Sequence, residues 1–319
     1  MTAKEKIQQL QSIIISEISP LITNDYVLWG LPYYSNIGDT LIWEGELEFL
    51  KSIPYKCIGT CGWDEYEYRP LSKDTVILIT GGGYFGDVWR KAWDNAQSAI
   101  KRYPIILLPQ TIFYESQTLL EADSVRLAKL QNLTVCVRDE VSYQIAKTHF
   151  KNTVRLVPDM AFCISKGYLD LWRVAEENKV LFLKRTDKEL GGKNVQIKAE
   201  DIDVKDWPTM DCRPTLGDWL FYKSMGVEFH TKRCCTWLHH ISEWVVEKLG
   251  YYMYRKSMTR RGVQFVSQYK EIYTTRLHVM ILSVLLGKRV HFIDNSYGKL
   301  SSFYKAWLSD CDGVDAFGQ

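Results

Sequence analysis

Arg276 and His278 are the residues of this sequence whose positions most need a chemical explanation. They lie in "EIYTTRLHVMILSVLLGK" (271–288), a pattern that predicts a short strand, a turn of two threonines and a buried helix ending at Gly287. A helix N-terminus carries about half a positive charge, so a cation in its first turn costs about 0.3–1 kcal/mol unless something compensates. The free N–H groups of that turn bind phosphate or carboxylate. The pair therefore predicts a site for an anion.

Both side chains suit such a ligand. Arginine's planar guanidinium binds carboxylate or phosphate with two parallel hydrogen bonds. An imidazole can donate a proton at neutral pH or neutralise charge that develops on a phosphate. Arg185 ends the predicted strand "VLFLKR" and is the candidate for a second cation, whereas Lys184 alternates to the opposite face. The alternatives are a helix-capping histidine and solvated arginines.

Four glycines follow the predicted strand "TVILIT" in the stretch "GGGYFGD" (81–87). Gly81, Gly83 and Gly86 formally match G-x-G-x-x-G, the dinucleotide-binding pattern. However, the stretch follows the third predicted strand rather than the first, and the acidic residue expected about 20 positions later is missing. We expect a loop whose backbone approaches a ligand closely, or else one that packs a helix tightly on the sheet.

The order of the predicted elements indicates the fold class. Apolar, β-branched or aromatic runs alternate with helical patterns through the first half, which implies a parallel, doubly wound sheet. Asp39 and Asp139 are expected helix N-caps. The predicted strands are "YVLWG", "YKCIG", "TVILIT", "PIILLPQ", "LTVCVRD" and "VRLVPD", and the helical patterns cover residues 39–52, 87–102, 116–130 and 139–150.

A second, smaller α/β unit restarts at "VLFLKR". We expect a loop over 186–209, helices near 215–225 and 233–249, and a strand at "VQFVS" (263–267) before the strand–helix unit that contains Arg276. The chain is thus predicted to form two Rossmann-like, doubly wound domains facing a cleft, over residues 1–165 and 166–319. Ligands of such folds bind at the carboxyl ends of the strands.

Composition excludes several classes of protein. The chain has 319 residues, 46% hydrophobic and 24% charged, as in soluble globular proteins, and a net charge of +2 gives no case for nucleic acid. The amphipathic pattern at 3–18 is not a secretory signal, and no apolar run approaches the ~20 residues that span a bilayer. We expect a cytoplasmic protein whose eight cysteines are reduced. Cys235 and His239 have metal-ligand spacing but no second ligand pair, so a packed helix is favoured.

The motifs together resemble one known family, the polysaccharide pyruvyl transferases. The matching stretches, spread over roughly residues 26–305, are "NIGDTLI", "GGGYFGD", "PQT", "RDEVSY", "PDMAF", "LKRTD", "TTRLHVMILSVLLGK" and "NSYGKL". The resemblance implies a two-domain architecture like that of B-type glycosyltransferases. It also implies that phosphoenolpyruvate donates a pyruvyl group to a sugar, forming a ketal and releasing phosphate, with no organic cofactor and no catalytic metal.

The resemblance also implies roles for individual residues. Phosphoenolpyruvate would lie against the C-terminal domain and the acceptor sugar against the N-terminal one. Arg276 and His278 match the family's Arg-x-His element, with His278 as general acid or phosphate-stabilising group, and Asp39 either deprotonates an acceptor hydroxyl or only caps a helix. The expected substrate-binding residues are Arg185, Tyr297, Lys299, Asn36, Gly82, Gly83 and Arg138.

Two other functions stay open at this point. A nucleotide-sugar glycosyltransferase of the same fold would need an acidic residue for the ribose, and none follows "TTRLH" until Asp294. A non-catalytic protein that binds anionic glycans is the second alternative. If the acceptor is carried on a lipid, the protein would work at the inner face of the membrane, and the helix at 3–18 is one place for that contact. Homo-oligomerisation is left open.

Overall fold

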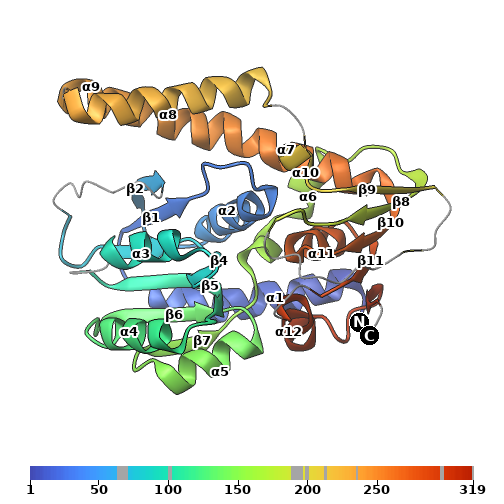
Figure 1. Cartoon of the computed structure of the whole chain (residues 1–319), viewed down its shortest axis with the longest axis horizontal. Helices are drawn as coiled ribbons and strands as arrows, with labels where there is room; N and C mark the ends of the chain where they lie inside the picture. The colour runs from blue at the N-terminus through green and yellow to red at the C-terminus, as the bar shows by residue number, and fades with distance from the viewer. Residues whose placement is uncertain are drawn as a thin grey trace.

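A computed structural model describes residues 1–62, 71–99, 103–187, 197, 201–211, 214–234, 236–294 and 298–317. It is an α/β structure built on two parallel sheets that lie next to each other (Figure 1). This confirms the α/β class and the parallel sheets that the sequence predicts. The first sheet has the order β2-β1-β3-β5-β6-β7, with β4 paired to β5. Its strands are β1 Tyr26–Leu31, β2 Cys57–Gly62, β3 Val76–Ile79, β4 Gly82–Gly86, β5 Ile105–Phe113, β6 Leu133–Val137 and β7 Thr153–Leu156.

Strand β1 shows why the sheet is covered on both faces. Its residues are all buried, and successive side chains point to opposite faces. Leu28 belongs to a core shared with the second half of the chain, whereas Val27 and Trp29 belong to a separate core on the other face. A near-continuous apolar run is what a parallel strand buried on both faces requires.

The helices of the first half follow the predicted pattern closely. They are α1 Ala3–Ile18, α2 Ile37–Leu50, α3 Arg90–Ala99, α4 Gln117–Leu127 and α5 Glu140–His149, with the 3-10 turns η1 Ser19–Leu21 and η2 Met160–Cys163. Asp139 caps α5 as predicted. The other predicted cap is wrong, because Asn36 caps α2 and Asp39 lies in its first turn.

The second sheet has the order β12-β11-β10-β8-β9. Its strands are β8 Glu177–Leu183, β9 Ile202–Lys205, β10 Tyr269–Thr274, β11 Arg289–Phe292 and β12 Val314–Ala316. Its helices are α6 Lys166–Asp170, α7 Pro208–Asp211, α8 Leu216–Cys234, α9 Thr236–Leu249, the π-helix η3 Gly250–Tyr254, α10 Arg255–Ser267, α11 Leu277–Leu285 and α12 Lys299–Trp307.

Three predictions for this half and the glycine stretch are corrected. "VQFVS" is not a strand but the end of α10, where the buried residues Met258, Val263 and Val266 recur at helical spacing over a longer window. The expected loop at 186–209 contains β9 and the start of α7. The glycine stretch is not a loop throughout, because residues 82–86 form β4.

Both sheets reverse their strand order at one point, β1/β3 in the first and β8/β10 in the second. Such a switch point leaves a crevice outside the carboxyl ends of the two strands, where ligands of doubly wound folds bind. The residues that follow these strands are the predicted site residues: Asn36 after β1, Gly83 after β3, Arg185 after β8 and Arg276 after β10.

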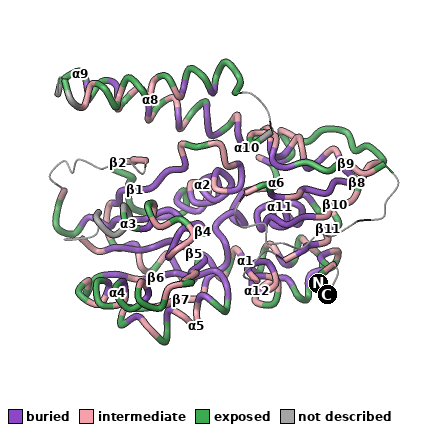
Figure 2. Tube along the Cα trace, viewed as in Figure 1, coloured by how far each residue is buried: buried purple, intermediate pink, exposed green. Residues whose placement is uncertain are grey.

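One continuous core holds the two sheets together. It includes Leu28 and Leu41 of the first half and Leu181, Ile272 and Leu282 of the second. Helix α2, buried over most of its surface, packs on both α10 and α11 (Figure 2). The first sheet ends at residue 156 and the second begins at residue 177. The predicted domain boundary falls between these two residues.

Helix α1 runs along both sheets, and its first turn lies beside the C-terminal part of the chain (Figure 1). Its apolar residues Leu10, Ile14 and Ile18 are buried in the shared core, so this face is not available to a membrane. Lys6 pairs with Asp310 near the C-terminus. Among the described residues, none of the helices combines the length and the apolar character needed to cross a bilayer.

Helices α8 and α9 form an antiparallel hairpin that stands apart from the two sheets (Figure 1). Trp219, Trp237 and Trp244 are each at least half exposed on it. Its base is held by aromatic contacts of Phe221 with Tyr33 and Tyr254. The hairpin is therefore the described surface richest in exposed aromatic side chains.

Candidate active site

A cavity of about 570 Å³ lies where the carboxyl ends of the two sheets meet. The first half contributes Asn36, Asp39 and Gly83 to its wall, and the second half contributes Arg276, His278 and further residues. The strand ends that the sequence singled out therefore surround one space. Of the predicted site residues, the cavity is lined by Asn36, Asp39, Gly83, Arg185, Arg276, His278 and Lys299.

Two threonines set the position of the arginines. The Thr275 hydroxyl accepts the backbone N–H of Arg185 at 2.9 Å, and the Thr274 hydroxyl accepts that of Arg276 at 2.9 Å. Thr274 also donates to the carbonyl of Leu183, so the ends of β8 and β10 are tied together. The two-threonine turn thus brings both arginines to the same edge of the sheet.

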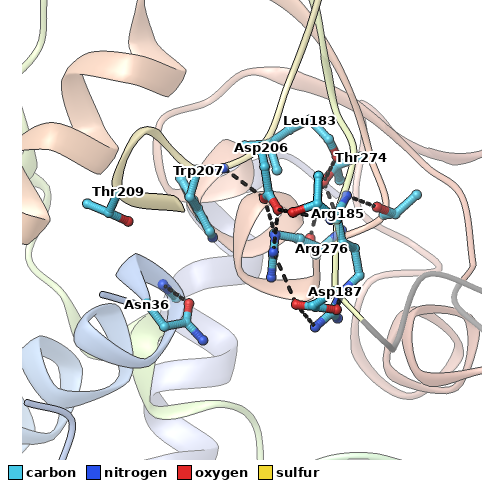
Figure 3. A network of polar contacts seen from close by, with 12 residues as sticks. Asn36, Leu183, Arg185, Asp187, Asp206, Trp207, Thr209, Thr274 and Arg276 are labelled. Carbon is cyan, nitrogen blue, oxygen red and sulfur yellow. Dashed lines mark hydrogen bonds and ion pairs between the residues drawn. The ribbon is translucent and has the colours of Figure 1, made fainter. Parts of the chain in front are cut away.

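Two aspartates contact these arginines (Figure 3). Arg276 donates from Nε and Nη2 to the two carboxylate oxygens of Asp206 at 2.5 and 2.7 Å, and from Nη2 to Asp187 at 3.2 Å. Arg185 donates from Nε and Nη2 to the two oxygens of Asp187 at 2.8 and 3.0 Å. Asp187 therefore lies between the two guanidinium groups on the cavity wall.

His278 belongs to a buried network that crosses between the two halves. Its Nε2 lies 3.3 Å from Oδ2 of Asp159, and the same oxygen accepts from Nη1 of Arg138 at 2.5 Å. Burial by itself would raise the pKa of Asp159, but the adjacent His278 and Arg138 outweigh this and hold it well below its usual range. An ionised Asp159 fixes the ring orientation, leaving Nδ1 of His278 as the nitrogen not turned toward it.

Arg138 itself is fully buried and does not line the cavity. Its Nε donates to the Thr111 hydroxyl at 2.9 Å. Its Nη2 has no hydrogen-bond partner in the part of the chain that the structure describes. A Cβ added to Gly83 would lie 3.4 Å from this nitrogen and only 2.6 Å from Nζ of Lys299. Because Gly83 has no side chain, the cationic groups of Lys299 and Arg138 can both approach the cavity wall at this point.

The first turn of α12 has an acceptor for its N–H groups within the chain. The side chain of Asp294 accepts the N–H groups of Leu300 and Ser301. The carboxylate therefore already satisfies two of the N–H groups in the first turn of this helix, and Lys299 is the described residue of this turn that lines the cavity. Tyr297 lies outside the described residues.

The opposite wall carries polar and aromatic groups from the first half. Asp39 accepts from Nδ2 of Asn36 at 2.7 Å and from the Tyr34 hydroxyl at 3.0 Å. Trp89 and Tyr34, which are 42% and 40% exposed, also line the cavity. Exposed aromatic faces beside a carboxylate suit the binding of a sugar ring and its hydroxyls.

Gly82 is the remaining predicted residue, and it lies beside the cavity rather than on its wall. Sequence reasoning missed the counterions Asp187 and Asp206, and it did not indicate that Asp159 contacts the histidine. The one available signal was Asp187 two residues after Arg185, since such spacing allows a local ion pair. In the described residues, no three histidine, cysteine or acidic side chains are placed to hold a metal ion.

Comparisons with known proteins show the family of this chain. The family model described as polysaccharide pyruvyl transferase matches residues 36–297. The chain belongs to this family. It is 29% identical over 313 residues to EpsO of Bacillus subtilis strain 168, which carries a provisional pyruvyl transferase name, covering 97% of this chain and 91% of that protein. It is 28% identical to Pyruvyl transferase 1 of Schizosaccharomyces pombe, covering 90% and 71% of the two chains.

A solved structure supports the fold alone. A functionally uncharacterised protein of Klebsiella pneumoniae superposes with a TM-score of 0.62 at 19% identity, covering 99% of this chain and 98% of that one. The family membership makes the protein a transferase and supports pyruvyl transfer to a polysaccharide in general terms.

Proposed function

We propose that the protein transfers the pyruvyl group of phosphoenolpyruvate to a sugar of a polysaccharide or of its lipid-linked precursor. The observation that carries this is the convergence of Arg185, Arg276, His278 and Lys299 on one cavity whose opposite wall holds Asp39. A small ligand with a carboxylate and a phosphate needs this concentration of cations. Residues 166–319 would form the donor domain and 1–165 the acceptor domain, with the cavity as the cleft between them.

The reaction needs two proton transfers from the acceptor. A sugar hydroxyl attacks C2 of the enolpyruvyl group as C3 gains a proton, the C2–O bond to phosphate breaks, and a second hydroxyl closes the ketal. One hydroxyl proton replaces the proton given to C3, and the other leaves with phosphate. His278, held by Asp159, is the proposed general acid or phosphate-stabilising group, and Asp39 is the proposed acceptor of a hydroxyl proton.

The arrangement disfavours a nucleotide-sugar glycosyltransferase. Such an enzyme often uses a carboxylate to bind ribose hydroxyls, and Asp294, the first acidic residue after the Arg-x-His element, instead accepts N–H groups of the first turn of α12. For a lipid-linked acceptor, the α8–α9 hairpin rather than α1 is the surface to meet the membrane. Exposed tryptophans favour the interface between headgroups and acyl chains, and the apolar face of α1 is buried.

Calorimetric titration with phosphoenolpyruvate, beside a panel of nucleotide sugars, tests the proposal. Saturable binding of phosphoenolpyruvate by the intact protein, lost in Arg276→Ala, is the expected result. Phosphate release on adding a sugar acceptor would then establish transfer. Binding of a nucleotide sugar in place of phosphoenolpyruvate would overturn the proposal, and donor binding without phosphate release from any acceptor would favour a binding protein.

A further inference from the structure

Asp187 occupies a position that an anionic ligand would be expected to take. Both of its carboxylate oxygens accept hydrogen bonds from Arg185, at 2.8 and 3.0 Å, and one also accepts from Arg276 at 3.2 Å. In Figure 3 it lies beside the two arginines on the side away from Asp206. This is the side-on, two-point contact by which a guanidinium binds a planar carboxylate.

Asp206 contacts the same arginine but is a different kind of group. Its side chain is fully buried, and it accepts from the N–H groups of Thr186 and Trp207 as well as from Arg276. These bonds fix it in the fold, so it holds Arg276 in place. The side chain of Asp187 is 28% exposed and lines the cavity. It is therefore the member of the pair that a ligand can replace.

We propose that Asp187 is a built-in competitor of the donor, occupying the position that the donor's carboxylate takes when it binds. The inference rests on the proposed function. It assigns the two anionic groups of phosphoenolpyruvate to different ends of the cavity. The carboxylate replaces Asp187 between Arg185 and Arg276, and the phosphate lies near Gly83, Lys299 and His278.

Charge and shape support this assignment. Among the described residues, two arginines face two aspartates here, so replacing the carboxylate of Asp187 by that of a ligand leaves their summed charge unchanged. A phosphate in the same position would add negative charge beside Asp206, which is buried and cannot leave. At the other end, the missing side chain of Gly83 lets the cationic groups of Lys299 and Arg138 come close to the same point. His278 lies on that side as well, where it can assist the departing phosphate.

The test compares three Asp→Asn variants by calorimetry, with phosphoenolpyruvate, pyruvate and inorganic phosphate as separate probes. Asp187→Asn keeps the shape but removes the competing charge, so it should bind phosphoenolpyruvate and pyruvate about fivefold more tightly, the scale of a partly exposed ion pair. Its affinity for phosphate should not change. Asp206→Asn should bind all carboxylate probes more weakly, because Arg276 loses its anchor. Asp203→Asn, a partly exposed aspartate that pairs with Lys205 and does not line the cavity, should match the unmodified protein.

A second comparison separates the two ends of the cavity. Arg185→Ala should lose pyruvate binding and keep phosphate binding, and Lys299→Ala should do the reverse. If Asp187→Asn binds phosphoenolpyruvate more weakly or equally, Asp187 positions the arginines and the proposal is overturned. If it binds phosphate rather than pyruvate more tightly, the assignment of the carboxylate is wrong.

These outcomes are distinct from a failure of the proposed function. If the unmodified protein binds no phosphoenolpyruvate, the donor itself is wrong. If it binds the donor and releases phosphate to an acceptor, while Asp187→Asn fails to tighten binding, the inference alone is wrong. Thermal denaturation of each variant guards against misfolding of Asp206→Asn. If Asp206→Asn misfolds, the comparison of Asp187→Asn with Asp203→Asn still shows whether Asp187 competes with the donor.

Discussion

At the scale of single residues, the candidate site combines side chains that are far apart in the chain. His278 follows β10, its partner Asp159 follows β7, and Arg138 follows β6. A histidine oriented by an ionised carboxylate is a recurrent device for proton transfer, because the carboxylate fixes the orientation of the ring. The sequence indicated the histidine but could not indicate what orients it.

His278→Gln should lower kcat by about 10²–10⁴-fold, the range for losing a general acid or base. Glutamine keeps a hydrogen-bonding side chain of similar reach, so the melting temperature should change little. The matched control is His240→Gln, since His240 is half exposed on α9. Steady-state kinetics of phosphate release and thermal denaturation of both variants make the comparison. A near-normal kcat for His278→Gln would remove this residue from the mechanism.

At the scale of elements, the first turn of α2 packs directly on the catalytic candidate. A Cβ added to Gly38 would lie 2.7 Å from Nδ1 of His278, closer than real Cβ contacts. Gly38 is in a helix without positive φ, so an alanine there meets no backbone strain. The glycine in "NIGD" is therefore explained by the histidine that approaches it, which is a contact between the two halves of the chain.

Gly38→Ala should lower kcat at least about tenfold, because small displacements of a catalytic group have effects of this size. Gly226→Ala is the matched control, a glycine in α8 with nothing within 4 Å of the added Cβ. It should leave kcat unchanged and stabilise the protein by about 0.5–1 kcal/mol. Kinetics and urea denaturation of both variants provide the measurement, and equal kcat values would show that His278 yields to the methyl group without consequence.

At the scale of the whole molecule, a buried carboxyl group holds the glycine stretch to α2. Glu46 accepts from the Thr80 hydroxyl and from the Gly81 N–H, and it is fully buried. Burial raises the pKa of this carboxyl from its ordinary value of 4.5 to about 8, against the effect of both hydrogen bonds. Folding and the protonation of Glu46 are therefore linked.

The free energy of unfolding should fall as the pH rises from about 4.5 to about 8, by up to about 1.4 kcal/mol per pH unit from Glu46 alone. Below this window the group is protonated in both states, and above it the group is ionised in both. Within the window only the unfolded chain releases the proton. Glu46→Gln should flatten this fall, whereas Glu48→Gln, on the same helix and paired with Lys51, should not. Urea denaturation at several pH values tests this, and equal slopes for Glu46→Gln and the unmodified protein would contradict it.

Local sequence patterns were enough to predict most helices and strands of the first half. Parallel strands buried on both faces and amphipathic helices of ordinary length leave strong periodic signals. The prediction of a strand at "VQFVS" was wrong because a five-residue window cannot distinguish the buried end of a helix from a strand. Strand β9 was missed because it is polar and half exposed, with a weak signal.

The sequence by itself determined the parallel α/β class, the family, and which strand ends carry the cations and Asp39 of the cavity wall. Only the tertiary structure decided the partners: Asp159 beside His278, Asp187 between the arginines, and Gly38 against the imidazole. The reason is physical. Strand and helix periodicity is encoded by neighbours in the chain, whereas the environment of each charge is set where two sheets meet, by residues as far apart in the chain as Asp159 and His278 or Gly38 and His278.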